Sequence, residues 1–285
     1  MSASAFPSSI LTHTDMQDSK TSVFFFAHQD DEFGVYNLIE NEITKGSRVI
    51  CLYLTDGAFA SATSEIRSAE SIEVLRRLKV KITDVHFVGE EIGISDGNLA
   101  VRLVQAGAWV NEFLGRINSP TSIYFPAWEG GHQDHDALHA MLVSIAESHG
   151  LLARCWQFSL YHSNKCPGLS FRVLSPLSEN GRSIDIRIPW VKRFNYLRYC
   201  LSYPSQVKTW AALFPFVLFK YLLSGRQQIQ PVSVSRISER PHQGKLFYEK
   251  RGNYTWADII QHIDIFRLSM NSLHNCSQTQ ENSDT

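Results

Sequence analysis

Residues 22–32 read SVFFFAHQDDE, which joins a short apolar run to a cluster of ionisable side chains. The run from Ser22 to Ala27 is bounded by polar residues, as is typical of a buried β-strand. Residues 32–45 then show helical spacing, and Gly46 lies where a helix usually ends. The stretch therefore predicts a strand, a charged loop and a helix, in that order.

Predicted strands and helices continue to alternate as far as residue 162. Short runs rich in β-branched and aromatic residues predict strands, and the amphipathic segments between them predict helices. The strands are residues 48–54, 85–88, 122–125 and 155–162, and the helices are residues 64–80, 98–117 and 134–149. Such alternation is typical of βαβ units, so we expect an α/β fold with a mostly parallel sheet.

The ends of the chain differ in character from this central part. We interpret the polar residues 1–20 as a flexible leader, because they lack the apolar core of a secretory signal. The α/β domain is predicted over residues 21–163, and residues 164–274 are predicted to form a mainly helical C-terminal extension packed on it. Residues 275–285 are predicted to be a disordered tail.

Charge and cysteine content exclude several classes of protein. The 27 Lys and Arg residues nearly balance the 28 Asp and Glu residues, which gives no electrostatic case for nucleic-acid binding. The five cysteines are odd in number and lack a CxxC pair, so neither disulfides nor a cysteine-based zinc site is expected. We therefore expect reduced thiols and a cytoplasmic protein. The sequence lacks an uninterrupted apolar run of about 18 residues, so a membrane-spanning helix is not expected.

The charged loop after the first strand is a candidate metal site. Four ionisable side chains within five residues are costly near a core unless they hold something. His28 and Asp31 are three residues apart at a helix start and can reach one metal ion, which leaves Asp30 free. Alternatively, the acidic residues simply favour a helix N-terminus, although that does not explain His28. This cluster alone leaves both interpretations open.

A second cluster, PAWEGGHQDH, occupies residues 126–135 and again joins a predicted strand to a helix. Gly130 and Gly131 permit tight backbone turns close to a ligand. Two histidines, His132 and His135, follow three residues apart. Because the carboxyl ends of parallel strands meet at one edge, we expect both clusters around one crevice. Spacing alone leaves open which of the two histidines binds a metal.

Together, the motifs HQDDE at residues 28–32 and HQDH at residues 132–135 resemble those of the PIG-L/LmbE-like deacetylases. The family pattern is AHPDDE after the first strand and HxDH further along, and the resemblance covers roughly residues 21–163. It implies a Rossmann-like α/β fold with helices on both faces of the sheet. It also implies zinc-dependent removal of the N-acetyl group from an N-acetylglucosamine conjugate.

By position, the resemblance implies that His28, Asp31 and His135 are the zinc ligands. It likewise implies Asp30 as the general base and His132 as the residue that stabilises the oxyanion. Gln29 stands where the family usually has Pro, which removes a rigid turn residue but no ligand. Imidazole and carboxylate ligands also suit other divalent metals, so Fe²⁺ is an alternative to Zn²⁺.

Three further residues are candidates for substrate binding. Asp56 follows the second strand and belongs to a substrate-side loop of the family or to an ordinary Asp-Gly turn. Trp128 and Glu129 line the mouth of the pocket or have a packing role. The sequence leaves these alternatives open.

On the predicted helices, Arg67 is a fourth candidate for substrate binding. It resembles the first residue of an Arg-x-x-Glu element of the family and could bind a sugar hydroxyl or a phosphate. Otherwise it forms a solvated ion pair with Glu70. His139 follows His135 by one turn, and without an HExxH glutamate we expect a helix-surface histidine or one that supports the site.

Residues 210–223 form the most apolar segment of the chain. We interpret it either as a core or dimer-interface helix, or as an interfacial segment that meets a lipid-linked sugar at a membrane. The partners expected are thus an N-acetylated amino sugar and, under these interpretations, a second copy of the chain or a membrane surface.

The leading hypothesis is a metal-dependent N-deacetylase of a GlcNAc-type sugar in glycoconjugate biosynthesis. One alternative is a metal-dependent amidase on another sugar conjugate, such as a thiol conjugate. Another is a non-catalytic sugar-binding module. A dinucleotide-binding oxidoreductase is disfavoured, because acidic residues rather than GxGxxG follow the first strand.

Overall fold

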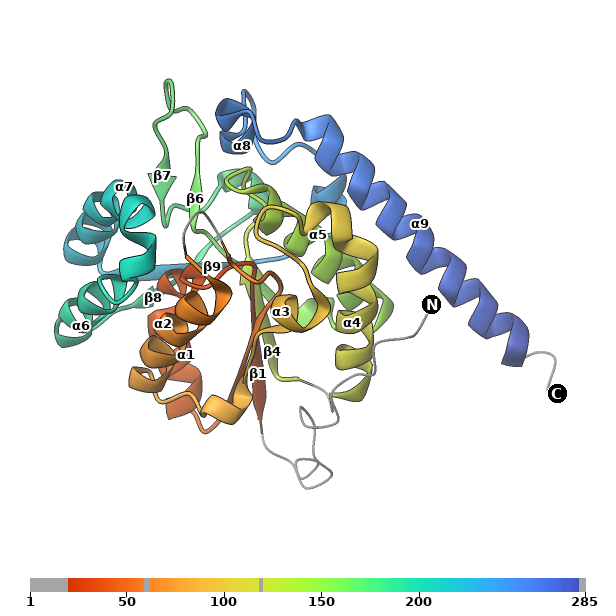
Figure 1. The fold of residues 1–285 in the computed structure, drawn as a ribbon, viewed down its shortest axis with the longest axis horizontal. Coiled ribbons are helices and arrows are strands. Elements are labelled where there is room, and N and C mark those ends of the chain that lie inside the picture. Colours follow the sequence, from red (N-terminus) through yellow and green to blue (C-terminus); the bar gives the residue numbers. More distant parts are fainter. Residues whose placement is uncertain (1–19, 59–61, 118–119, 282–285) are drawn as a thin grey trace.

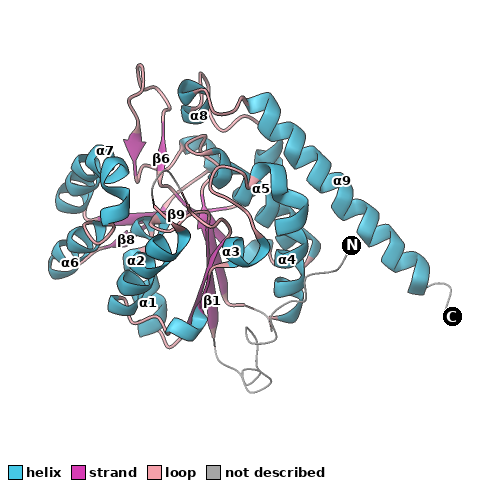
Figure 2. Ribbon diagram, in the orientation of Figure 1, coloured by secondary structure: helices cyan, strands magenta, loops and turns pink. Residues whose placement is uncertain are grey.

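The computed structural model describes residues 20–58, 62–117 and 120–281, which are built around one mixed sheet (Figures 1 and 2). The strand order is β3-β2-β1-β4-β5-β9-β8. The first five of these strands are mutually parallel, β9 runs antiparallel to β5, and β8 runs antiparallel to β9. Their bounds are β1 Thr21–Phe26, β2 Arg48–Tyr53, β3 Val85–His86, β4 Ser122–Pro126, β5 Cys155–Phe158, β8 Ile184–Arg187 and β9 Arg226–Pro231.

Helices cover both faces of the sheet, as Figure 1 shows. The side chains of β1 alternate between two cores: Val23 and Phe25 face one, whereas Phe24 and Phe26 face the other. A strand that is apolar on both sides must be covered on both sides. The helices are α1 Tyr36–Thr44, α2 Ser64–Arg77, α3 Val88–Ile92, α4 Leu103–Arg116, α5 Gln133–Ser148, α6 Trp190–Cys200, α7 Val207–Phe219, α8 Phe247–Arg251 and α9 Trp256–Glu281.

The predicted α/β fold with a mostly parallel sheet and helices on both faces is confirmed. The C-terminal extension supplies more than helices, because β8 and β9 complete the sheet. A separate two-stranded hairpin, β6 Tyr161–His162 with β7 Arg172–Val173, stands above the sheet edge. The strand predicted over residues 155–162 is therefore divided between β5 and β6.

The proposed division of the chain into parts stays a prediction. The leader predicted over residues 1–20 lies almost wholly outside the described residues. Helix α9 continues through residues 275–281 of the predicted tail, and residues 282–285 are again outside the described part. Among the described residues, Cys51, Cys155, Cys166 and Cys200 are unpaired, and the expectation of reduced cysteines stays a prediction.

Within the described residues, one helical stretch, Pro204–Ser224, is long and apolar enough to cross a membrane by length and composition alone. It comprises α7 and the short turns that flank it. Only 22% of the stretch is buried, so most of it lies on the surface. Helix α7 packs its Trp210, Leu213 and Val217 side chains inward and leaves Phe216 and Phe219 exposed.

Candidate metal centre and active site

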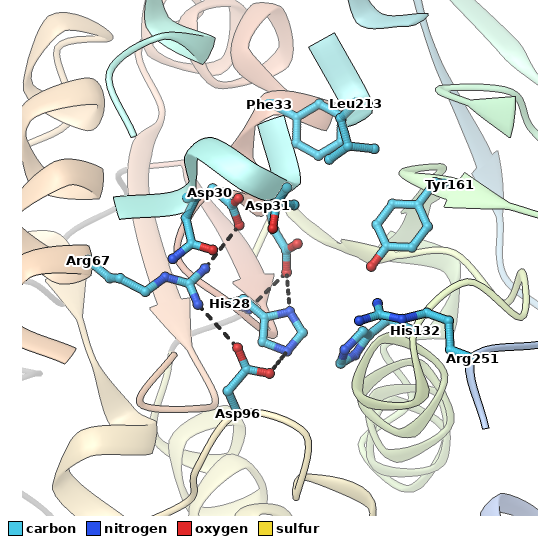
Figure 3. A pocket seen from close by; sticks show the side chains of 12 residues that line it. His28, Asp30, Asp31, Phe33, Arg67, Asp96, His132, Tyr161, Leu213 and Arg251 are labelled. Atoms are coloured by element: carbon cyan, nitrogen blue, oxygen red, sulfur yellow. Dashed lines mark hydrogen bonds and ion pairs between the residues drawn. The ribbon is translucent and has the colours of Figure 1, made fainter. Parts of the chain in front are cut away.

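A pocket opens where the loops after β1 and β4 meet (Figure 3). Because the strands are parallel, their carboxyl ends lie at the same edge of the sheet, as the sequence predicts. Helix α7 and the hairpin complete the wall. The lining residues are His28, Asp30, Asp31, Phe33, Arg67, Asp96, His132, Tyr161, Gln206, Thr209, Leu213 and Arg251.

The Asp31 carboxylate is fixed by the backbone that precedes it. Its Oδ2 atom accepts hydrogen bonds from the amides of Ala27, at 3.1 Å, and His28, at 2.9 Å. Its Oδ1 atom faces Nε2 of His135, which lies 3.1 Å away on α5. This side chain is therefore held with one oxygen directed at the histidine of the second motif.

His28 is oriented by two carboxylates. Its Nε2 atom lies 3.0 Å from Oδ2 of Asp134 and 3.3 Å from Oδ1 of Asp96, while Nδ1 faces Asp31 at 3.7 Å. Asp134 also accepts hydrogen bonds from the backbone amides of Gly97 and Leu99, which fix its position. A proton on Nε2 satisfies both carboxylates, and a metal bound at Nδ1 would take the place of the proton that otherwise faces Asp31.

His28, Asp31 and His135 fit a metal ion. One ligating atom of each lies within 4.8 Å of the others, and all three side chains are buried. Zinc bonds of about 2.0–2.1 Å in tetrahedral geometry place neighbouring ligand atoms about 3.4 Å apart. The distances of 3.1 and 3.7 Å between Asp31 and the two histidines lie on either side of this value.

A second group, His28, His132 and Asp134, meets the same distance criterion. It fits a metal less well, because both oxygens of Asp134 already accept hydrogen bonds from backbone amides. The Nδ1 atom of His132 likewise accepts a hydrogen bond from the Asp134 amide, at 3.2 Å. The structure thus favours the first group, the one expected by resemblance.

Asp30 lies beside this group with an uncommon backbone conformation. Its φ of 105° is in the left-handed region, which non-glycine residues occupy chiefly where the surrounding structure enforces it. Its Oδ1 atom accepts a hydrogen bond from Arg67 at 3.3 Å. Burial raises the pKa of Asp30 to about 8, and the positive charge of Arg67 opposes the rise. The carboxyl group lines the pocket and is not one of the three candidate ligands.

The structure indicates which nitrogen of His132 carries the proton. Burial lowers the pKa of this histidine well below its ordinary value, and the charges of His28 and His135 act in the same direction. The ring is then neutral. Because Nδ1 accepts the amide hydrogen of Asp134, the proton lies on Nε2. His132 thus offers the pocket a neutral N–H donor rather than an imidazolium.

Arg67 joins three loops at the base of the pocket. Its guanidinium donates hydrogen bonds to the carbonyl oxygens of Gln29 and Gly57 and pairs with Asp30 and with Asp96, the latter at 3.1 Å. It is only 3% exposed, so the alternative of a solvated ion pair with a helix neighbour is wrong. The predicted contact with substrate stays a prediction.

Asp96 is a pocket residue that the sequence reasoning missed. Burial alone would raise its pKa, but the positive charge of His28 lowers it below the ordinary range, so the group is a carboxylate. It follows β3 and α3 in a loop at the same sheet edge as the two motifs. The rule that sites form at the ends of parallel strands would have pointed to this loop.

We predict that Arg67→Met destabilises the protein by about 3–5 kcal/mol, because it leaves the buried Asp30 carboxyl without its cation and two loop carbonyl oxygens without their donor. Arg226→Met, which breaks an exposed pair with Asp185, should cost less than about 1 kcal/mol. Urea unfolding of the two variants measures both values. Equal, small effects would contradict the role of Arg67 in joining the loops.

Asp56, Trp128 and Glu129 are not among the described residues that line the pocket. The Asp56 carboxylate accepts hydrogen bonds from the amides of Ala58 and Asp96, and its carbonyl oxygen accepts one from the Gln29 side chain. The side chain that replaces the family's proline therefore ties two pocket loops together.

Trp128 and Glu129 are fully buried behind the pocket. The Trp128 ring packs on Trp256 of α9, and its Nε1 donates to a backbone carbonyl. Oε1 of Glu129 accepts hydrogen bonds from the amides of Leu160 and Tyr161, at 2.7 and 2.8 Å. Glu129 thus supports the hairpin strand that carries Tyr161 into the pocket wall, whereas Trp128 packs against the C-terminal part of the chain.

His139 is fully buried, so of the two alternatives the helix-surface histidine is wrong and a histidine that supports the site remains. Its Nδ1 lies 2.9 Å from the Pro126 carbonyl oxygen and its ring packs against Phe125 and Trp128. Burial lowers its pKa to about 4. The site therefore keeps a neutral histidine behind the strand end rather than a further ligand.

This lowered pKa predicts a loss of stability in acid. Between pH 6.5 and 4 the unfolded chain protonates at this position and the folded chain does not, so stability falls as the pH falls. The contribution of His139 is about 3 kcal/mol over this range. We expect the free energy of unfolding, measured with urea, to fall less between pH 7 and pH 4 in His139→Gln than in the unchanged protein. The difference between the two losses should be about 3 kcal/mol. An unchanged loss in the variant would refute the assignment.

Comparison with known proteins gives a family for the larger part of the α/β region. Residues 23–146 match the model of the PIG-L family, described as GlcNAc-PI de-N-acetylase. No curated protein matches the chain. The matched residues contain both motifs and all three candidate metal ligands.

Several solved structures share the fold. The zinc-inhibited form of teicoplanin deacetylase Orf2 is 14% identical, with a TM-score of 0.57 over 75% of this chain and 98% of that chain. N,N'-diacetylchitobiose deacetylase from Pyrococcus horikoshii is 19% identical, with a TM-score of 0.53 over 77% and 86% of the two chains. Residues 23–146 of the chain therefore match the PIG-L family model, and the chain shares its fold with solved deacetylases.

Proposed function

We propose that this protein is a metal-dependent hydrolase that removes the N-acetyl group from a GlcNAc-type sugar or glycoconjugate. The observation that carries the proposal is the cluster of His28, Asp31 and His135, which adjoins a pocket that two further groups line. Those groups are the Asp30 carboxyl, which can accept a proton from water, and the His132 N–H, which can donate to the carbonyl oxygen of the amide. The family match and the similar deacetylase structures support the same reaction.

The three ligands would hold Zn²⁺, with Fe²⁺ as the alternative. A bound zinc ion would make a water molecule more acidic and polarise the acetyl carbonyl. Asp30, next to the ligands but not one of them, accepts the proton of the attacking water. Once protonated, the same carboxyl group is an acid, and it can then pass this proton to the departing amine.

His132 acts on the carbonyl oxygen. A neutral imidazole that donates from Nε2 can stabilise the developing oxyanion without a change in its own charge. A donor of this kind contributes about 3–4 kcal/mol to the stability of the transition state. Its hydrogen bond from the Asp134 amide holds the ring in the required tautomer.

We assign recognition of the sugar to the part of the pocket wall that Arg67 and Asp96 form (Figure 3). Arg67 and Asp96 are paired with each other and line the pocket beside His28. A donor next to an acceptor in a fixed geometry suits the paired hydroxyl groups of a sugar ring. We propose that these two residues bind the sugar, with Asp56 holding the Asp96 loop in place.

Acetate release from a panel of GlcNAc conjugates tests the function. The purified protein is assayed after chelation and again after addition of Zn²⁺ or Fe²⁺. Metal-restored release from one conjugate is the expected result, and the more active metal identifies the better cofactor. Release of a different acyl group or cleavage of a thiol conjugate would favour the alternative amidase. Binding of sugar without any cleavage would favour a binding module.

A further inference from the structure

Glu32 closes the first motif, HQDDE, and has no part in the chemistry proposed above. Its side chain is fully buried, and it is not among the described residues that line the pocket. A buried carboxylate costs free energy unless hydrogen bonds replace the water that it has lost. The partners of Glu32 therefore indicate what the carboxylate does there.

Both carboxylate oxygens of Glu32 accept hydrogen bonds. Oε2 accepts the backbone amide hydrogen of Asp30 at 2.9 Å, and Oε1 accepts the hydroxyl hydrogen of Tyr53 at 3.0 Å. Tyr53 is the last residue of β2 and is itself fully buried. The Glu32 carboxylate thus connects a strand of the sheet to the amide of the residue proposed as general base.

The backbone of Asp30 has a conformation that must be held in place. Its φ of 105° lies in the left-handed region, where a residue other than glycine stays only if its surroundings enforce it. The carbonyl oxygen of Asp30 accepts the Phe33 amide hydrogen at 3.2 Å, and the carboxyl group pairs with Arg67 (Figure 3). The amide is the remaining point of attachment, and it donates to Glu32.

The value of φ decides where the Asp30 carboxyl group points. The peptide unit before Asp30 is planar, so rotation about the N–Cα bond swings the side chain relative to it. Without an acceptor for the amide, φ can relax to a negative value, and the carboxyl group then turns away from its place in the pocket. A displacement of about 1 Å near the reacting atoms can cost about 100-fold in rate.

We propose that Glu32 is a positioning residue, whose carboxylate holds the Asp30 amide and thereby directs the Asp30 carboxyl group into the pocket. The proposal rests on the proposed function, since the position of Asp30 affects catalysis only if Asp30 is the base. A residue that merely completes a buried polar network would act on stability alone. A positioning residue must act through Asp30, and this difference can be measured.

Glu32→Met and Glu32→Gln test the proposal. The two new side chains have nearly the length of Glu, but only Gln keeps an oxygen that can accept the Asp30 amide hydrogen. Glu32→Met should lower the kcat of acetate release about 10–100-fold and change KM less than about 2-fold. Glu32→Gln should keep kcat within about 3-fold. Equal losses of kcat in the two variants, or no loss in Glu32→Met, would overturn the proposal.

Glu42 provides the matched control for the loss of a buried carboxylate. It is 3% exposed and accepts hydrogen bonds from the side chains of Ser22 and Lys45, both at 2.7 Å. Ser22 lies near the start of β1, at the end of the strand opposite the pocket. Glu42→Met should lower stability and leave kcat unchanged. A loss of kcat as large as that of Glu32→Met would mean that stability is the cause, and would overturn the proposal.

A double variant separates positioning from an independent effect on activity. In Asp30→Asn the base is already absent, so the addition of Glu32→Met should lower the residual kcat less than about 2-fold. Two residues that act through one group show such non-additive losses. A further loss as large as in the otherwise unchanged protein would mean that Glu32 acts without Asp30, which would overturn the proposal.

Crystal structures of the two variants separate failure of this proposal from failure of the proposed function. In Glu32→Met the φ of Asp30 should leave the left-handed region, whereas in Glu32→Gln it should stay near 105°. This result would support the hold on Asp30 even if no conjugate releases acetate. A φ that stays near 105° in Glu32→Met would overturn the proposal and leave the proposed function standing.

Tyr53→Phe replaces Glu32→Met if that variant does not fold. It removes one hydroxyl group, frees Oε1 of Glu32 from β2 and keeps the acceptor of the Asp30 amide. A less firmly held carboxylate should lower kcat about 3–10-fold with KM unchanged, and should have no effect when Asp30→Asn is present. An unchanged kcat would overturn the proposal.

Discussion

Asp30→Asn should lower kcat by about 10²–10⁴-fold, the contribution of a positioned general base. The amide cannot accept the proton of water, yet it has nearly the size of the carboxyl group and can still accept the hydrogen bond from Arg67. The three metal-binding side chains are untouched. Acetate release and metal content measured on the same preparation would therefore show an inactive protein with its metal in place.

The exposed carboxylate of Asp185 provides the matched control for this variant. Asp185→Asn makes the same chemical change in β8, where the side chain pairs with Arg226 on the surface. It should leave kcat unchanged. If Asp30→Asn kept full activity, Asp30 would not be the base. If it lost the metal, Asp30 would belong among the ligands.

His135→Gln should abolish metal binding and lower activity by at least about 10³-fold, as the loss of a group on which all the chemistry depends does. His135 is fully buried, and its Nε2 atom faces the free oxygen of Asp31. The amide of Gln is a much weaker ligand for zinc than imidazole. Calorimetric titration of zinc into chelated protein measures the affinity, and acetate release measures the activity.

His132→Gln is the informative partner of this variant. It makes the same change three residues earlier, at the start of the same helix. We expect it to keep its metal and to lower kcat by about 10²–10³-fold, through loss of the oxyanion donor. The reverse outcome, in which His132→Gln loses the metal and His135→Gln keeps it, would move the metal to the group of His28, His132 and Asp134.

The alternation of strands and helices in the first half of the chain could be predicted because the strands in that half are largely apolar. In a parallel sheet covered on both faces, strands such as Thr21–Phe26 are marked by hydrophobicity alone. The motif residues could be predicted as neighbours for a related reason. They follow strands whose carboxyl ends meet at one edge.

Strand β9 could not be predicted in this way, because its sequence RQQIQP is polar. Gln227 and Gln230 are nonetheless buried. Gln227 donates to the carbonyl oxygen of Gly34 and accepts from the amide of Leu38, and Gln230 donates to two other carbonyl oxygens. Buried amides of this kind are stable only when their partners are present, and those partners lie far away along the chain.

The pocket residue Asp96 was missed for a comparable reason. It belongs to no motif, and only the fold brings it to His28 and Arg67. Trp128 and Glu129 show the opposite case, in which neighbours of a motif histidine face away from the pocket. Sequence proximity to a motif thus brought together the candidate ligands but indicated the rest of the pocket poorly.

The order of the sheet bears on how the protein can be divided. Strand β5 is covered on one side by β9, which comes from the far end of the chain. A fragment that ended soon after the family match would present the unpaired amides and carbonyls of β5 to solvent, and such a bare edge recruits other chains. In the whole chain β9 covers this edge, and fragments for expression should keep residues 226–231.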